Sequence, residues 1–132
     1  MIKRSISRLL ALVLACAICL MGCSTNSILT GNYQQDTLAT VNALRAAIEL
    51  PENSPEKATS QAEARQIINE FVSRYRRNNA TESLSSFTTM RTALNSLAGH
   101  YSSYGNRPLP EKLKARIEYQ FKQVEAALKR GA

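Results

Sequence analysis

The chain has 132 residues, of which 20% are charged and 44% are hydrophobic, a composition typical of one globular domain. It contains 17 Lys and Arg against 10 Asp and Glu, for a formal charge of +7, and it has three Cys, one His and no Trp. This composition excludes a disordered or collagen-like chain and leaves almost nothing from which to build a metal site, but it does not indicate an activity.

The first 22 residues have the layout of an export signal. A basic start is followed at residues 9–21 by thirteen consecutive apolar residues, which is short for a transmembrane helix. The sequence Leu-Met-Gly-Cys at residues 20–23 resembles the lipobox of bacterial lipoproteins. That resemblance implies cleavage before Cys23 and attachment of lipid to its sulfur. An ordinary cleaved signal and an uncleaved anchor are the alternatives.

Cleavage before Cys23 would change both charge and cysteine content. It would remove three basic residues and leave 14 basic and 10 acidic ones, a charge of +4 that does not indicate a nucleic-acid partner. Cys16 and Cys19 would leave with the signal, so no disulfide is expected. Residues 23–31 are small and polar and are predicted to be a lipidated tether between the membrane and a soluble body.

The first helix of the body is predicted to begin after Asn32, because Gln35 three residues later completes a capping box. Pro51 disfavours helical backbone at Leu50, so the helix should end there. Its polar face is expected to turn Arg45 outward. The apolar residues at helical spacing are Leu38, Val41, Leu44 and Ile48.

A second helix is predicted from Ser54, as its N-cap, with Pro55 in the first helical position, to the pair Asn78 and Asn79. Its inward stripe consists of Ala64, Ile68, Phe71, Val72 and Tyr75.

Two more helices follow. The third is predicted to start at Ser85 and to stop at Gly105, and the fourth to start after Pro110 and to end at Gly131. Their inward residues are Phe87, Met90, Leu94, Leu97, Ala98 and Tyr101 in the third, and Leu113, Ile117, Phe121, Val124 and Leu128 in the fourth.

No segment shows the alternation of a strand, and the joins between the helices are short. The sequence therefore predicts an all-α protein, with an antiparallel up-down-up-down four-helix bundle at residues 32–132 after the cleaved lipoprotein signal at residues 1–22.

A bundle core could hold haem or two irons, but the sequence does not support either. His100 is the only histidine, no Glu precedes it by three residues, and the inward positions are apolar or aromatic. No cofactor and no enzymatic activity are predicted. His100 is either a pH switch or an exposed residue near a helix C-terminus.

The predicted topology places the tethered start of the first helix beside the ends of the second and fourth. That end of the bundle would be basic, which complements the helix dipoles and could also provide contact with anionic lipid headgroups or an acidic protein loop. The residues concerned are Arg74, Arg76, Arg77, Lys129 and Arg130.

Six stretches taken together resemble the small lumenal lipoprotein family of cyanobacterial photosystem II that acts in assembly and repair. They are LTGNY (29–33), AEARQ (62–66), SRYRR (73–77), SSFTTM (85–90), the run from AGHY to RPLPEKL (98–113) and FKQVE (121–125).

The resemblance implies a non-catalytic protein on the lumenal side of the thylakoid membrane. It also implies transient binding to immature or damaged photosystem II, chiefly at the large lumenal loop of an inner chlorophyll-binding antenna protein, while the manganese–calcium cluster is assembled. The protein is expected to be a monomer. The alternative is a generic envelope lipoprotein that binds another protein or transports a hydrophobic ligand.

The resemblance does not identify the contact residues, so these are inferred from chemistry. A docking surface needs a few aromatic and Arg anchors on a rigid body, and two regions offer them. The first, at the third helix end and the following turn, contains His100, Tyr101, Tyr104, Arg107 and Lys112, and the second contains Arg74, Arg76, Arg77 and Arg91.

Overall fold

The computed structural model describes residues 28–105 and 107–132. The predictions for the export signal and for Cys23 lie outside the described residues. Within the described ranges all regular structure is helical. The helices are α2 (Tyr33–Glu49), α3 (Lys57–Tyr75), the short α4 (Asn79–Glu82), α5 (Ser85–Tyr104) and α6 (Glu111–Lys129).

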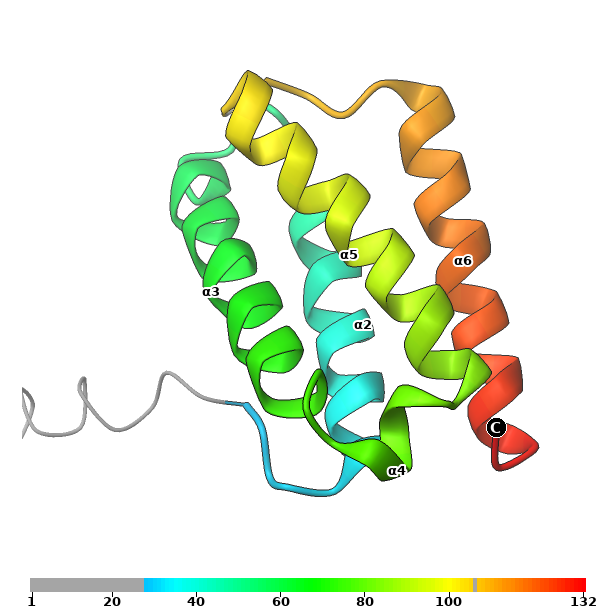
Figure 1. Cartoon of the computed structure of the whole chain (residues 1–132). Helices are drawn as coiled ribbons and strands as arrows, with labels where there is room; N and C mark the ends of the chain where they lie inside the picture. Colours follow the sequence, from blue (N-terminus) through cyan, green and yellow to red (C-terminus); the bar gives the residue numbers. More distant parts are fainter. Residues whose placement is uncertain (1–27, 106) are drawn as a thin grey trace, which may run out of the picture.

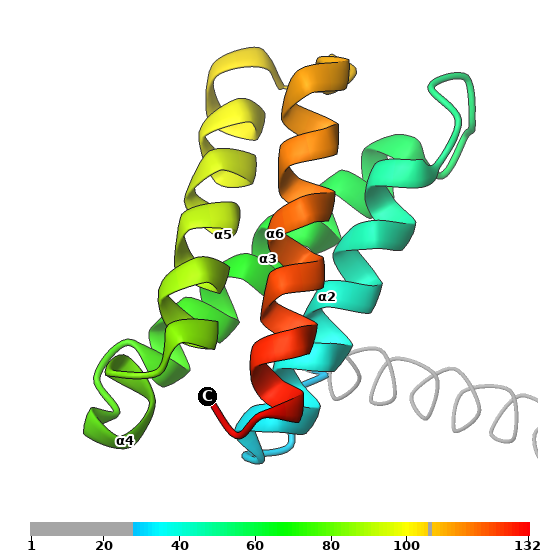
Figure 2. The same ribbon diagram turned by 90° about the vertical axis from the view of Figure 1, so that its right-hand side faces the viewer.

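The four long helices run alternately up and down (Figure 1), which confirms the predicted bundle. Helix α2 packs against α3 and α6, and α5 packs against the same two helices from the other side. Figure 2 shows α5 and α6 side by side, while α3 crosses the bundle obliquely. One end of the bundle therefore brings together the start of α2, the end of α3, α4, the start of α5 and the C-terminus.

The core is formed by the predicted apolar stripes. Leu44 of α2, Phe71 of α3, Leu94 of α5 and Phe121 of α6 have no solvent exposure. A few of the predicted inward residues lie at the margin, partly buried against this core; these are Leu38, Ile48, Val72, Ala98 and Leu113.

The predicted helix boundaries are confirmed at some ends and wrong at others. Asn32 caps α2 by accepting a hydrogen bond from the Gln35 amide at 3.0 Å. Gly105 ends α5 with φ of +59°, a conformation that favours glycine. The start of α3, however, is not at Ser54, because the Ser54 carbonyl accepts from the Lys57 amide in a turn that precedes the helix.

The join between α3 and α5 contains a helix that the sequence did not predict. Helix α3 already ends at Tyr75, and Asn78 then caps α4 by accepting from the Ala80 amide at 2.9 Å. The Thr81 hydroxyl also donates to the Tyr75 carbonyl, so this join folds back onto the end of α3.

Candidate interaction surfaces

The tether meets the bundle at Asp36, a carboxylate in the first turn of α2 with no solvent exposure. It accepts hydrogen bonds from the Thr30 amide at 2.7 Å, the Thr30 hydroxyl at 2.8 Å and the Gly31 amide at 3.0 Å. The Tyr75 hydroxyl of α3 donates a fourth. We call this set of contacts among Thr30, Gly31, Asp36 and Tyr75 the tether latch.

The tether latch shortens the predicted tether. Residues up to 31 were expected to be a free connection, but Thr30 and Gly31 are bonded to Asp36, and Leu29 packs against the core. Gly31 has φ of +96°, which a residue with a side chain rarely adopts. The last residues of the predicted tether are therefore part of the folded body.

The latch keeps Asp36 ionised. Burial by itself would raise the pKa of its carboxyl, but the hydrogen bonds from Tyr75, Thr30 and Gly31 outweigh burial and hold this pKa below its ordinary value. Burial and the hydrogen bond to Asp36 raise the pKa of Tyr75 to about 12, so its hydroxyl stays a donor. The network thus satisfies a buried negative charge with four hydrogen bonds.

Further contacts join all four long helices at the same end. The Tyr33 and Ser86 hydroxyls lie 2.8 Å apart and connect α2 with α5, and the Ser86 amide donates to the Ala132 carbonyl at 3.0 Å. The Tyr33 and Tyr75 rings pack edge to face at 5.2 Å. This end of the bundle is therefore well ordered by contacts between distant parts of the chain.

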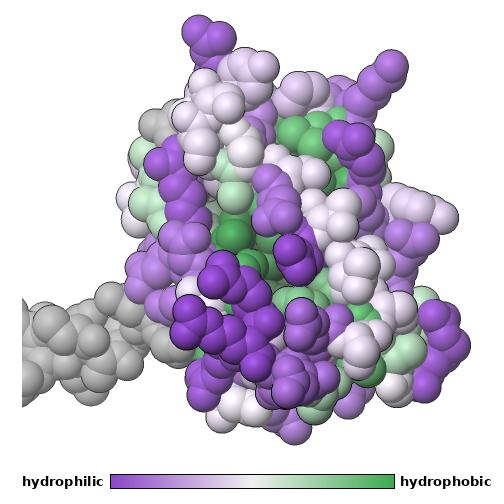
Figure 3. All heavy atoms as spheres, viewed as in Figure 1, coloured by the Kyte–Doolittle hydropathy of each residue, from purple (hydrophilic) through white to green (hydrophobic). Residues whose placement is uncertain are grey.

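The outer surface of this end is basic, and we call it the basic end. All of its cationic residues are exposed at the ends of α3 and α6, as the sequence predicted; they are Arg74, Arg76, Arg77, Lys129 and Arg130. Figure 3 shows strongly hydrophilic side chains gathered over the lower part of the visible face. Arg91, the other candidate assigned to this region, is exposed on α5 about 9 Å along the axis from its first residue.

The second candidate region is only partly available as a surface. Tyr104, Arg107 and Lys112 are exposed around the join between α5 and α6, and we call these three residues the turn surface. His100 is only 6% exposed, and its Nε2 lies 2.9 Å from the Arg107 carbonyl. The expectation of an exposed His100 is therefore wrong, because its ring connects the end of α5 to the following turn.

The prediction that Tyr101 belongs to an exposed docking surface is also wrong, because Tyr101 is a core residue with 1% exposure. The Arg65 guanidinium lies over its ring at 5.7 Å and donates to its carbonyl at 2.7 Å. Its side chain is therefore covered by α3 and cannot reach a partner in this structure.

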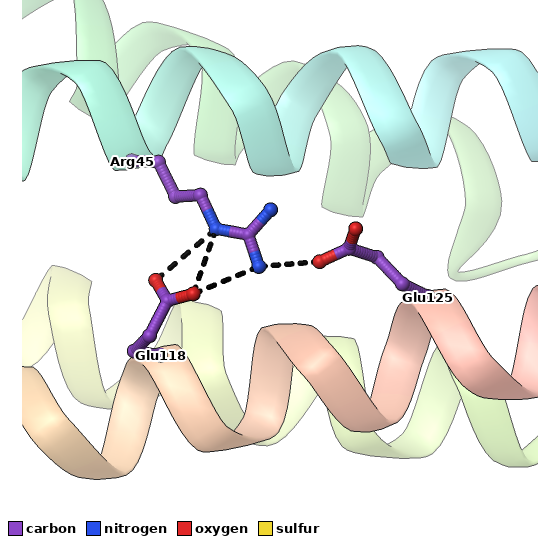
Figure 4. A network of polar contacts seen from close by, with 3 residues as sticks. All are labelled: Arg45, Glu118 and Glu125. Carbon is purple, nitrogen blue, oxygen red and sulfur yellow. Dashed lines mark hydrogen bonds and ion pairs between the residues drawn. The ribbon is translucent and has the colours of Figure 1, made fainter.

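A cluster that the sequence did not predict connects α2 with α6 (Figure 4). Arg45, expected to point outward, donates from Nε to the two Glu118 oxygens at 3.0 and 3.1 Å and from Nη2 to Glu125. The hydrogen bond to Glu125 and the attraction of Glu118 raise the pKa of Arg45 despite partial burial. The signal available in the sequence was the spacing of Glu118 and Glu125, seven residues apart on one helix face.

This cluster is partly open to water, so its expected contribution is modest. Arg45 is 22% exposed and Glu118 39%. We predict a coupling free energy of about 0.5–1 kcal/mol between Arg45 and Glu118, as for other solvent-screened pairs. A double-mutant cycle with Arg45→Met and Glu118→Gln, measured by urea unfolding, tests this; strictly additive single effects would contradict it.

The described residues also bear on membrane and metal sites. Within residues 28–105 and 107–132 no helix is both long and apolar enough to cross a bilayer. The same residues contain no group of three His, Cys, Asp or Glu side chains arranged to hold a metal ion. What this part of the chain offers is a packed core with charged outer surfaces.

Comparison with known proteins gives one consistent result. The family described as Photosystem II Pbs27 matches residues 5–128. The chain is 58% identical over 131 residues to the photosystem II assembly factor lipoprotein Psb27 of Thermosynechococcus vestitus, with 98% of each chain covered. It is 37% identical over 100 residues to the chloroplast photosystem II repair protein PSB27-H1 of Arabidopsis thaliana, covering 75% of this chain and 58% of that one.

A solved structure of a relative agrees with these sequence matches. The solution structure of Psb27 from cyanobacterial photosystem II superposes with a TM-score of 0.76 at 53% identity, covering 83% of this chain and 94% of that one. For that relative, the solution structure shows a helical bundle in a chain that corresponds to 83% of this one. Since the match spans almost the whole sequence and the same helical fold, this chain belongs to the photosystem II Psb27 family.

Proposed function

We propose that this protein is a non-catalytic assembly and repair factor of photosystem II. The observation that supports the proposal most strongly is 58% identity over 98% of the chain to a relative named as an assembly factor lipoprotein. The name of the chloroplast relative adds repair to assembly. The closely packed core favours docking through the exterior of the bundle over transport of a hydrophobic ligand inside it.

The proposal includes a location. The chain is anchored by lipid on Cys23 to the thylakoid membrane, on its lumenal side, and acts as a monomer. Intact-mass measurement of the protein purified from membranes should show acyl chains on a chain that begins at Cys23. A Cys23→Ser variant should leave the membrane fraction, because two or more acyl chains are needed for stable anchoring.

The proposed partner is immature photosystem II, bound transiently at the large lumenal loop of an inner chlorophyll-binding antenna protein during assembly of the manganese cluster. Two surfaces of the bundle fit a protein partner. The turn surface combines an aromatic ring with two cations, and the basic end with Arg91 offers several guanidinium groups, which are frequent anchors at interfaces.

Retrieval of photosystem II subunits by a tagged chain tests the assignment. We expect Arg91→Glu or Arg107→Glu to lower the amount of antenna protein retrieved at least tenfold, because each reverses an exposed charge on a candidate surface. Lys122→Glu, an equal charge change on an exposed part of α6, is the matched control and should have little effect. Unchanged retrieval by both arginine variants would refute the assignment of these surfaces.

A further inference from the structure

The bundle has an uneven charge distribution along its axis. At the basic end, five exposed cations outnumber the acidic side chains, which among the described residues there are the exposed Glu82 and the buried Asp36 of the tether latch. The opposite end is mixed, because Arg107 and Lys112 are balanced by exposed glutamates. Those glutamates are Glu49, Glu52, Glu56 and Glu111. Charge is therefore distributed asymmetrically along the bundle axis, and the more positive end is the one where the chain enters the bundle.

The tether latch fixes the entry point of the chain at this positive side. Thr30 and Gly31 are held by Asp36, and Asp36 is held in turn by Tyr75 at the end of α3, directly before Arg76 and Arg77. The contacts of Tyr33 and Ser86 hold the neighbouring helix ends in place. The chain therefore enters the bundle at one fixed point, and this point lies at the basic end.

We infer that the basic end is a membrane-facing surface that binds anionic lipid headgroups and orients the bundle upright on the bilayer. This inference rests on the proposed lipid attachment at Cys23. Four residues lie between Cys23 and Ile28, so the five residue steps from one to the other reach at most about 18 Å. A lipid at Cys23 therefore holds the basic end near the bilayer, where the field of anionic headgroups is felt over a Debye length of about 8 Å at physiological salt.

Geometry favours a lipid surface over an acidic protein loop as the occupant of this end. Because the chain from Cys23 to Ile28 reaches at most about 18 Å, the end of the bundle that the latch joins to the tether is the end nearest to a lipid at Cys23. The turn surface lies at the other end of the bundle, pointing away from the bilayer and free for a protein partner. The five cations of the basic end would then be used for the membrane, which leaves the turn surface and Arg91 on α5 for photosystem II.

Vesicle binding by an unlipidated chain of residues 24–132 tests the inference. We expect at least tenfold stronger binding to vesicles with 30% phosphatidylglycerol in phosphatidylcholine than to phosphatidylcholine alone, and weaker binding as salt rises. The triple variant Arg76→Glu, Arg77→Glu and Arg130→Glu should lose at least tenfold in binding to the anionic vesicles.

The matched control has the same change in net charge at other exposed positions: Arg107→Glu, Lys112→Glu and Arg116→Glu. It should stay within about threefold of the unsubstituted chain, and circular dichroism should show equal helix content in all forms. Equal losses in both triple variants, or no dependence on anionic lipid, would overturn the inference. Loss of photosystem II retrieval by the basic-end variant with unchanged vesicle binding would likewise overturn it in favour of an acidic protein loop.

These outcomes are separable from the proposed function. Suppose that the lipidated chain still retrieves photosystem II subunits but the unlipidated chain does not bind anionic vesicles. This result would contradict only the inference that the basic end faces the membrane. A chain without lipid at Cys23 or without retrieved subunits would contradict the proposed function itself.

Discussion

Asp36→Asn is expected to lower the free energy of unfolding by about 2–4 kcal/mol at pH 7. The substitution removes a buried charge that accepts four hydrogen bonds, and it places an amide NH2 group against donors from Thr30, Gly31 or Tyr75. Urea unfolding followed by circular dichroism measures the loss. Glu63→Gln, which makes the same chemical change at an exposed position of α3, is the matched control and should change stability by less than about 0.5 kcal/mol.

The effect of Asp36→Asn should also depend on pH. The folded-state pKa of Asp36 is lowered, so its stabilising contribution is complete above the unfolded-state pKa of about 4 and is lost as pH falls through the folded-state value. The stability difference between the two proteins should be constant from pH 7 to 5 and should shrink below about pH 4. A constant difference down to pH 2 would contradict the latch as described.

The second large effect is expected at Lys57, a buried lysine at the start of α3. Its Nζ donates to the carbonyls of Leu50 at 2.9 Å and Ala47 at 3.2 Å, near the end of α2. No basic residue of α2 itself lies in the last turn of that helix. Lys57 therefore satisfies carbonyls that the helix leaves unpaired and supplies a positive charge at its negative end.

We predict that Lys57→Met lowers the free energy of unfolding by about 2–3 kcal/mol, because hydrogen bonds to a charged donor are lost at a largely buried site. For a domain of about 100 residues this corresponds to a fall in Tm of roughly 10 °C. Lys112→Met, at an exposed position, is the control and should leave Tm nearly unchanged. Equal Tm values for the two variants would show that the Lys57 bonds contribute nothing.

The helices and their inward faces could be predicted because apolar spacing is a local property of the sequence. The stripe that includes Leu94 and Leu97 placed Tyr101 in the core, and the structure confirms this position. The prediction of Tyr101 as a contact residue therefore conflicted with the helical spacing that places the same residue in the core. Where a pattern depends on neighbours three or four residues apart, the sequence is a sufficient guide.

The polar contacts could not be predicted, because their partners are far apart in the sequence or point where periodicity gives no information. Asp36 looks like an ordinary acidic residue of a first helical turn, yet its decisive partner is Tyr75, 39 residues away. Lys57 looks like a solvent-exposed residue of a helix start, and His100 like one near a helix end. Each is buried because a backbone carbonyl from another segment lies within reach of its side chain.

Cross-linking of the lipidated chain within thylakoid membranes, followed by identification of the linked peptides, tests the central claim most directly. We predict links from Lys112, on the turn surface, to the large lumenal loop of an inner antenna protein, and none from Lys129 at the basic end to that loop. Links to proteins unrelated to photosystem II, without any to its subunits, would contradict a role in its assembly.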